Sequence, residues 1–280
     1  MAGRLVKLLV STIVGCGDAV LGLVGGRHLP GSCVVISYHA VSEDSRSRFA
    51  QQLDLLLRLA KPIPAGRELH LEKGRRYVAI TVDDVFQSFV ANGLPELGQR
   101  NLPVTLFPPT GYLGLASAWA DYGGENKVGE KVASADDLKT IAKLGNVDFG
   151  SHSVTHADLA LLPEEEARRE LRNSKESLEA DIGRQVVALS FPYGSWGERE
   201  LRLAREAGYE FCFDSTPETV FSAFKSGLIG RVDVQPTDST LEFRLKVCGA
   251  YRWVRWASAW KRKFSRRFEG PSLVEDPTHG

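Results

Sequence analysis

The stretch Tyr77–Phe86 has the sequence YVAITVDDVF, and its two halves differ sharply in character. The first half is rich in Val, Ile and Thr, as is typical of a buried strand, and it stops at the adjacent carboxylates of Asp83 and Asp84. A buried strand does not continue easily through two neighbouring negative charges, so we expect the pair at the strand's carboxyl end. In parallel α/β proteins that end faces the active site. Considered alone, the pair is better explained as a strand end followed by an Asp-capped turn.

A second stretch, residues 147–159 with the sequence VDFGSHSVTHADL, favours the catalytic interpretation. It also begins as an apolar strand, and His152 and His156 follow that strand. Two imidazoles at this spacing can bind one metal ion, and a carboxylate would complete the three-ligand set of a catalytic zinc site with one position open to water. The alternative is a polar loop in which Ser151 and Ser153 satisfy the hydrogen-bonding groups of the two histidines. The Asp pair makes the metal site the better interpretation.

Strand-like and helix-like runs alternate from residue 32 onward, which indicates βαβ units and a mainly parallel sheet. We expect seven strands, near residues 34–37, 78–82, 104–107, 147–149, 186–190, 211–213 and 228–230. Helical patterns are clearest at residues 48–59, 135–144, 163–181 and 197–207. Residues 116–134 have the composition of a long loop, and such loops often cover a site.

Polar residues follow several of these strands, and successive strand ends of a parallel sheet or barrel lie on one rim. They are His39 after the first strand, Asp83 and Asp84 after the second, His152 and His156 after the fourth, and Pro192 and Tyr193 after the fifth. Residues more than a hundred positions apart are therefore expected to converge. This convergence predicts an active site better than any single motif does.

The motifs TVDDV, SHSVTH and FPYG resemble those of the polysaccharide deacetylases of carbohydrate esterase family four. The resemblance extends over about Val34–Asp233, and its most specific part is the HxxxH pair that follows a strand-terminal Asp-Asp. It implies an α/β fold, a distorted (β/α)7 barrel, in agreement with the seven expected strands. It also implies that Asp84, His152 and His156 bind a divalent metal, usually Zn²⁺.

The same resemblance implies roles for residues around the metal. Asp83 would be the general base, and the backbone N–H of Tyr193, after Pro192, would help to hold the oxyanion. Arg231 either orients Asp83 or forms a structural ion pair with it.

The general acid is a special case, because family members typically carry a catalytic histidine near the last strand. This chain has no histidine between His156 and His279, and Asp233 cannot replace an imidazole as proton donor near neutral pH. A subset similar to poly-N-acetylglucosamine deacetylases instead begins its domain with a Tyr-His pair whose histidine supplies the acid. The chain has ISYHAV there, so His39 is predicted to be the acid rather than an ordinary loop residue.

These roles predict a metal-dependent hydrolase that removes N-acetyl groups from sugars of an oligo- or polysaccharide, such as an exopolysaccharide or cell-envelope glycan. An alternative is a deformylase or deacylase of a lipid-linked aminosugar. A third interpretation is a non-catalytic glycan-binding or membrane-associated scaffold, since Val82 and Val85 stand where the family commonly has Phe and Gly.

Composition adds bounds on partners and on organisation. The 35 basic and 35 acidic side chains cancel, so no global field attracts nucleic acid. The four cysteines form no CxxC pair and are too scattered for a disulfide framework. We expect an amphipathic segment at 1–31, the deacetylase-like domain at 32–238, and a basic, Trp-rich helix and tail at 239–280.

The N-terminal segment is largely apolar between residues 5 and 24, but Lys7 and Asp18 make it a poor membrane-spanning helix. An amphipathic helix lying on the domain or on a membrane surface is favoured over a cleaved secretory or lipoprotein signal. The protein is therefore expected to be cytoplasmic or peripherally associated with a membrane.

The C-terminal segment opens with Ser239–Glu242, which resembles a capping box, and a helix is expected to continue to Gly270. Four aromatic residues at three- and four-residue steps share one face of it, and Lys and Arg crowd the remainder. The aromatic residues are Trp253, Trp256, Trp260 and Phe264. This helix either packs on the barrel or contacts an anionic membrane surface, and no nucleic-acid-binding module surrounds it.

Overall fold

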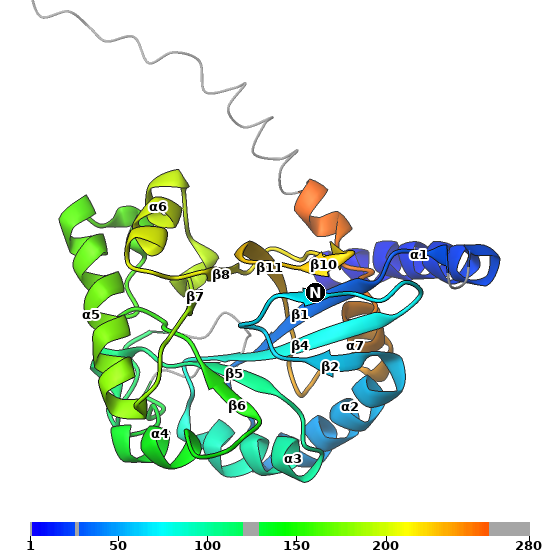
Figure 1. The fold of residues 1–280 in the computed structure, drawn as a ribbon. Helices are drawn as coiled ribbons and strands as arrows, with labels where there is room; N and C mark the ends of the chain where they lie inside the picture. Colours follow the sequence, from blue (N-terminus) through cyan, green and yellow to red (C-terminus); the bar gives the residue numbers. More distant parts are fainter. Residues whose placement is uncertain (1, 26–27, 120–128, 258–280) are drawn as a thin grey trace, which may run out of the picture.

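A nearly closed barrel of parallel strands forms the centre of the computed structural model, which describes residues 2–25, 28–119 and 129–257 (Figure 1). Seven parallel strands lie in the order β6-β5-β4-β1-β11-β8-β7. Their bounds are β1 (Ser32–Tyr38), β4 (Arg76–Asp83), β5 (Val104–Phe107), β6 (Val147–Phe149), β7 (Ala188–Ser190), β8 (Phe211–Asp214) and β11 (Gly227–Asp233). A parallel bridge between Ser151 and Leu189 connects the chain after β6 to β7 and so narrows the gap in the ring. The predicted barrel is confirmed.

Short strands at the edges were not predicted, because runs of two or three residues show no measurable period. They are β2 (Lys61–Ile63), β3 (Leu69–His70), β9 (Val220–Phe221) and β10 (Ala223–Phe224). β2 pairs with β4, β9 pairs antiparallel with β1, and β3 pairs with β10 in a separate small sheet.

Helices cover the outside of the barrel, and all four predicted helical segments are present (Figure 1). These are α2 (Arg46–Leu59), α4 (Ala135–Ile141), α5 (Glu164–Ile182) and α6 (Glu198–Glu206). α5 ends at Gly183, whose left-handed φ of 69° is favourable for glycine. The π-helical turn η3 (Phe89–Gly93) and the short α3 (Leu94–Gln99) were missed.

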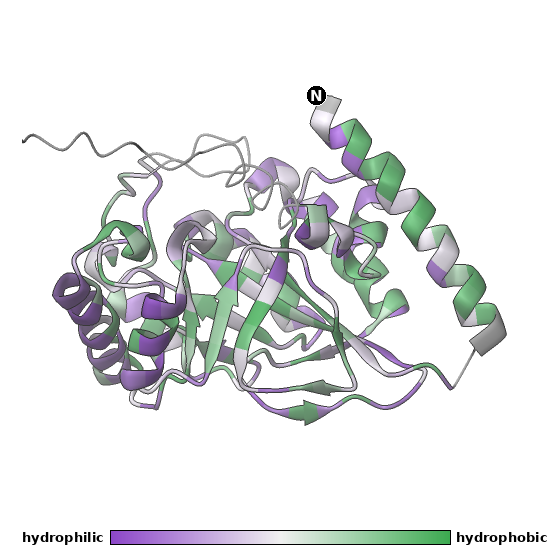
Figure 2. Cartoon of the chain, turned by 90° about the horizontal axis from the view of Figure 1, so that it is seen from above, coloured by the Kyte–Doolittle hydropathy of each residue, from purple (hydrophilic) through white to green (hydrophobic). Residues whose placement is uncertain are grey.

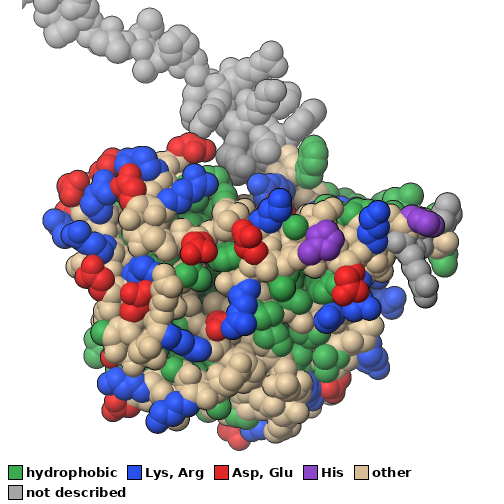
Figure 3. All heavy atoms as spheres, viewed as in Figure 1, with side chains coloured by type: hydrophobic (Ala, Val, Ile, Leu, Met, Phe, Trp, Pro, Cys, Tyr) green, Lys and Arg blue, Asp and Glu red, His purple; other side chains and the backbone are tan. Residues whose placement is uncertain are grey.

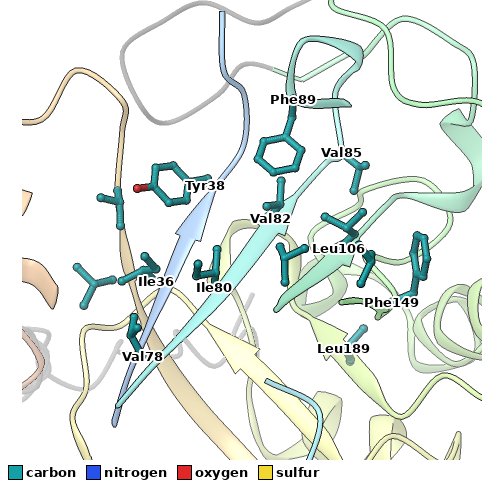
Figure 4. Close-up of a cluster of buried hydrophobic side chains, with 14 of the residues drawn as sticks. Ile36, Tyr38, Val78, Ile80, Val82, Val85, Phe89, Leu106, Phe149 and Leu189 are labelled. Carbon is teal, nitrogen blue, oxygen red and sulfur yellow. The ribbon is translucent and has the colours of Figure 1, made fainter. Parts of the chain in front are cut away.

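The alternation of side chains along each strand divides the apolar residues between two cores. Along β1, Cys33 and Val35 face the barrel interior, while Val34 and Ile36 face the helices. Figure 4 shows the outer core, in which Ile36, Val78 and Ile80 pack with residues from the neighbouring strands. Because the interior is filled by apolar side chains, a polar residue in it must lie near the rim or be paired.

The segment after the barrel departs from the expected single helix. α7 (Thr240–Val247) begins as predicted, with Ser239 Oγ accepting from the N–H of Glu242 at 3.2 Å. It ends two residues before Gly249, whose φ is 78° and where an added Cβ would lie 2.4 Å from Thr219 Oγ1. A helical turn then resumes at residues 253–257.

The prediction of one helix running to Gly270 is therefore wrong at Gly249. Trp260 and Phe264 lie outside the described residues. The division at residues 31 and 238 stays a prediction.

The N-terminal helix α1 (Ala2–Gly25) lies beside α7, at the edge of the molecule (Figure 2). Its residues Gly3–Leu23 are long and apolar enough to cross a membrane, by length and composition alone. Whether this segment contacts or crosses a membrane stays a prediction.

Candidate active site

Asp83 lies inside the barrel mouth and is paired with a buried arginine. Side chains at every second position of β4 face the interior, which places Asp83 on the same side as Ala79 and Thr81. Arg231, from β11, is fully buried and binds both carboxylate oxygens of Asp83, with Nη1–Oδ1 at 2.8 Å and Nη2–Oδ2 at 2.6 Å. Such a bidentate pair fixes the plane of the carboxylate.

Further contacts hold this pair in place. Ser190 Oγ, at the end of β7, donates to Asp83 Oδ2 at 3.2 Å and accepts from Arg231 Nη2 at 2.8 Å. The Arg231 guanidinium also donates to Thr81 Oγ1 and to the Asp214 carbonyl oxygen. Arg231 therefore links strands β4, β7, β8 and β11, in addition to fixing Asp83.

Asp84 turns away from the strand direction and faces two histidines. Its φ of 62° is rare for a residue with a side chain, and it breaks the alternation immediately after Asp83. Asp84 Oδ1 lies 3.4 Å from His156 Nε2 and 3.8 Å from His152 Nε2. One ligand atom from each residue lies within 4.8 Å of the others, as three ligands of one cation would.

The environment of these three residues fits a divalent metal. Asp84 Oδ1 is buried and has no hydrogen-bond partner, although buried polar atoms are ordinarily paired. His152 Nδ1 lies 2.8 Å from the carbonyl oxygen of Ser190, which can only accept, so Nδ1 carries the proton and the Nε2 lone pair faces Asp84. One carboxylate and two imidazoles form a donor set typical of catalytic zinc.

Burial sets the protonation states in this cluster. Burial, with His152 adding repulsion, lowers the pKa of His156 to about 2, so its ring is neutral and able to bind a metal. Burial likewise raises the pKa of Asp84, because its charged form has lost water. Burial alone would also raise the pKa of Asp83, but the Arg231 guanidinium, together with His152 and His39, outweighs it and holds that pKa well below its usual range.

Trp119 completes one wall of the site and was not identified from the sequence. Its indole stacks on the His156 ring, with centroids 4.2 Å apart and planes 7° from parallel. Tyr193 approaches the same imidazole edge-on at 4.7 Å. Trp119 belongs to the segment that was expected to be a long loop over a site, which was the available signal. Ser190 was also missed, although it directly precedes the FPYG motif.

His39 lies at the end of β1, near Asp233 at the end of β11. The two strands pair in parallel with Ser37 opposite Asp233, and His39 Nδ1 lies 3.7 Å from Asp233 Oδ1. The neighbouring Tyr38 points the other way, into the outer core, where its hydroxyl donates to Gln52 Oε1 at 2.9 Å. The Tyr-His pair is thus divided by strand alternation into a packing residue and a rim residue.

Pro192 and Tyr193 form the turn after β7, within η6 (Pro192–Gly194). Tyr193 has a φ of 60°, so three of the predicted site residues, Asp84, His156 and Tyr193, adopt left-handed backbone conformations. Strained conformations of this kind cluster at functional sites.

Comparison with known proteins agrees with the geometry. The sequence profile of the family described as polysaccharide deacetylase matches residues 70–212, more than half of the 280-residue chain. The chain belongs to the polysaccharide deacetylase family. It is a hydrolase of the class that acts on carbon–nitrogen bonds.

Individual relatives of this deacetylase are distant. YxkH of Bacillus subtilis is 23% identical over 233 residues, covering 79% of this chain and 76% of that protein. The poly-beta-1,6-N-acetyl-D-glucosamine N-deacetylase of Staphylococcus aureus is 24% identical over 180 residues, covering 61% of this chain and 58% of that protein. The solved structure of IcaB from Ammonifex degensii superposes with a TM-score of 0.61 at 22% identity, covering 81% of this chain and 98% of that chain. That likeness shows a common fold.

The deacetylase brings most of the predicted site residues to one rim. Asp84, His152 and His156 meet, and Asp83 and Arg231 form a pair beside them. The remaining candidates, His39, Pro192 and Tyr193, lie on neighbouring strand ends. Their catalytic roles stay predictions.

Proposed function

We propose that this deacetylase is a metal-dependent enzyme that removes N-acetyl groups from the amino sugars of a polysaccharide. The observation that carries the proposal is the side-by-side placement of a three-ligand cluster and an independently held carboxylate. Asp84 Oδ1 is left without a hydrogen-bond partner, as a ligand atom would be, whereas both oxygens of Asp83 accept hydrogen bonds from Arg231. The two adjacent aspartates thus have different environments and different roles.

Asp83 would accept the proton of the attacking water. Arg231 keeps the carboxylate ionised and oriented, but the same ion pair reduces its affinity for a proton. A divalent metal held by Asp84, His152 and His156, for which Zn²⁺ is our choice, would supply Lewis acidity that makes the water more acidic and polarises the amide carbonyl. Asp83 alone would be too weak a base for an ordinary water molecule.

The remaining steps use residues on the neighbouring strand ends. The backbone N–H of Tyr193 would donate to the oxyanion that develops as water adds to the amide carbon. His39, with Asp233 beside its Nδ1, would donate a proton to the departing nitrogen as the carbon–nitrogen bond breaks. The products are acetate and a free amino sugar.

The substrate class rests on the comparisons and on the placement of the acid. The Staphylococcus aureus relative is named for poly-beta-1,6-N-acetyl-D-glucosamine. His39 follows the first barrel strand, as in the subset of the family that the sequence resembles. Poly-N-acetylglucosamine is therefore the substrate to test first, and chitin oligomers are the second choice.

Acetate release from both glycans, with metal content measured on the same samples, tests the proposal. We expect turnover by the metal-loaded protein, and losses of about 10²- to 10⁴-fold for Asp83→Asn and His39→Ala without loss of metal. Matched controls are Asp136→Asn and His70→Ala, which change exposed residues outside the three-ligand cluster and the Asp83–Arg231 pair. Glycan binding without acetate release by the metal-loaded protein would identify a scaffold and overturn the proposal.

A further inference from the structure

α1 presents its apolar face outward, which is the reverse of a helix that packs on a soluble domain. Six large apolar residues on this outward face are between 56% and 86% exposed. They are Leu5, Val6, Leu9, Ile13, Val20 and Leu23. Figure 2 shows hydrophobic residues recurring along most of the helix, at the edge of the molecule. Exposed apolar faces of this extent mark interaction surfaces.

The inward face of α1 carries its polar contacts. Arg4 Nη2 binds Glu242 Oε2 at 2.7 Å near the N-terminal end, and Asp18 accepts two hydrogen bonds of 2.7 Å from Arg252 near the other end. Between them, Ser11 is fully buried and its Oγ accepts from Trp253 Nε1 at 2.9 Å. Both charged residues that make these contacts therefore face the protein, and the opposite face is left uncharged.

These contacts orient α1 along the barrel. Arg4 and Asp18 are 14 positions apart, or about 21 Å of helix, so the helix is held near both ends. At one end of the helix, Arg4 also pairs with Asp238, which follows the carboxyl end of β11. At the other end, Leu23 lines a groove together with Ser32 and Arg76, which begin β1 and β4. The helix thus runs from the rim that carries the active site to the opposite rim. A helix crossing a bilayer would have to break both ion pairs and place Arg4 or Asp18 in hydrocarbon.

A basic groove adjoins the C-terminal part of α1. Its volume is about 1160 Å³, and five cationic side chains and one acidic side chain line it. They are Arg58, Lys61, Lys73, Arg75 and Arg76, with Glu72 as the acid. Figure 3 shows hydrophobic side chains together with Lys and Arg at the end of the molecule that holds α1. Cations next to an exposed apolar face complement an anionic lipid surface.

We infer that α1 lies in the interface of an anionic phospholipid membrane, with its outward face in the acyl region and the basic groove against lipid headgroups. The barrel then rests on its side, and the mouth of the active site opens along the membrane surface near the N-terminal end of α1. This surface is independent of the deacetylase chemistry and differs from the aromatic C-terminal segment proposed from the sequence.

Vesicle flotation of the full-length protein tests the inference, with phosphatidylcholine vesicles that contain or lack phosphatidylglycerol. We expect the wild type to float, and to float more completely with phosphatidylglycerol. The double variant Leu9→Glu, Ile13→Glu should lose flotation on both kinds of vesicle. Leu144→Glu, which adds a charge at an exposed leucine away from α1, should float like the wild type.

The double variant Lys61→Gln, Lys73→Gln separates the headgroup contribution. It should weaken binding by roughly 25-fold on vesicles with phosphatidylglycerol, since each cation near the surface contributes about fivefold. Binding to phosphatidylcholine alone should change little. The same loss on both vesicles would overturn the assignment of the groove.

Two further measurements distinguish other occupants of the outward face. An alkaline carbonate wash should release the bound wild type, whereas retention would indicate a spanning helix and overturn the inference. In gel filtration without lipid, the wild type and the Leu9→Glu, Ile13→Glu variant should elute at the same size. A larger apparent size for the wild type would indicate that a second copy of the chain covers this face and would overturn the inference. Equal melting temperatures would show that the variant is folded, and flotation of that folded variant at the wild-type level would refute the inference.

Discussion

Arg231→Met should raise the pKa of Asp83 and reduce the stability of the barrel in a pH-dependent manner. Methionine retains much of the length of the side chain beside Phe107 and Phe213 but removes the cation. Asp83 would then keep its hydrogen bond from Ser190 and lose both bonds from the guanidinium.

The magnitude follows from burial of the pair. The Arg231 side chain is 0% exposed and that of Asp83 is 6% exposed, so water screens neither charge. Removing one partner of a buried ion pair costs about 3–5 kcal/mol, because the other charge is left without compensation. Arg231→Lys keeps the charge but loses the two-pronged geometry, and a smaller cost is expected.

The pH dependence separates this cost from a general loss of packing. In the wild type the folded-state pKa of Asp83 lies below its unfolded-state pKa. The ion pair therefore stabilises the folded protein fully above about pH 4. That stabilisation is lost as the pH falls through the folded-state pKa. In Arg231→Met, burial acts with less opposition and raises the folded-state pKa, so the protonated form is preferred. The difference in free energy of unfolding should therefore grow between pH 3 and pH 7.

Urea unfolding of the metal-free proteins at several pH values measures the difference in free energy of unfolding between wild type and Arg231→Met. The pH profile of kcat/KM for the metal-loaded proteins is the second measurement. The acid limb of the profile should move to higher pH in Arg231→Met. Arg184→Met is the matched control, since Arg184 also lies over an aromatic ring, that of Phe149, but is partly exposed and should cost less than about 1 kcal/mol. A folded Arg231→Met protein with a pH-independent deficit and an unmoved acid limb would refute the reasoning.

Three other predictions concern the metal site and the backbone. Asp84→Asn should bind Zn²⁺ far more weakly in a calorimetric titration and should keep the wild-type fold. The reason is that Asp84 supplies the one anionic ligand of the cluster that the described residues form. Trp119→Ala should weaken Zn²⁺ binding by up to about tenfold through loss of the stacked contact with His156; unchanged affinity would limit Trp119 to covering the site. Gly249→Ala should lower the free energy of unfolding by about 1–3 kcal/mol because of the φ of 78° and the contact with Thr219, and equal denaturation midpoints would contradict this.

Strand assignments from the sequence were accurate where the apolar runs were continuous. A strand buried on both sides has no alternation to interpret, but its β-branched composition and its abrupt end at a charged residue are local properties. Asp83 ends such a strand, and the helix starts and stops at Pro163 and Gly183 were also local signals. The failures involved segments whose structure depends on neighbours, such as η3 and the break at Gly249.

The orientation of the terminal helices shows the same limit. The residue pattern predicted an amphipathic α1, and amphipathicity alone does not say which face meets the protein. Arg4 and Asp18 pair with Glu242 and Arg252, more than 230 positions away, and these contacts turn the apolar face outward. Residues 2–25 alone do not specify that choice, because the partners of Arg4 and Asp18 lie in α7 and just after it.

The site itself divides in a similar way. The residue types and their order along the chain were sufficient to identify the family, the barrel and the group Asp84, His152 and His156, because strand ends of a parallel barrel must share a rim. The difference between the two aspartates required the tertiary structure. Strand alternation directs Asp83 to Arg231 inside the barrel, whereas a left-handed backbone at Asp84 directs the next carboxylate to the histidines. Adjacent residues in a chain acquire separate environments only when distant strands supply their partners.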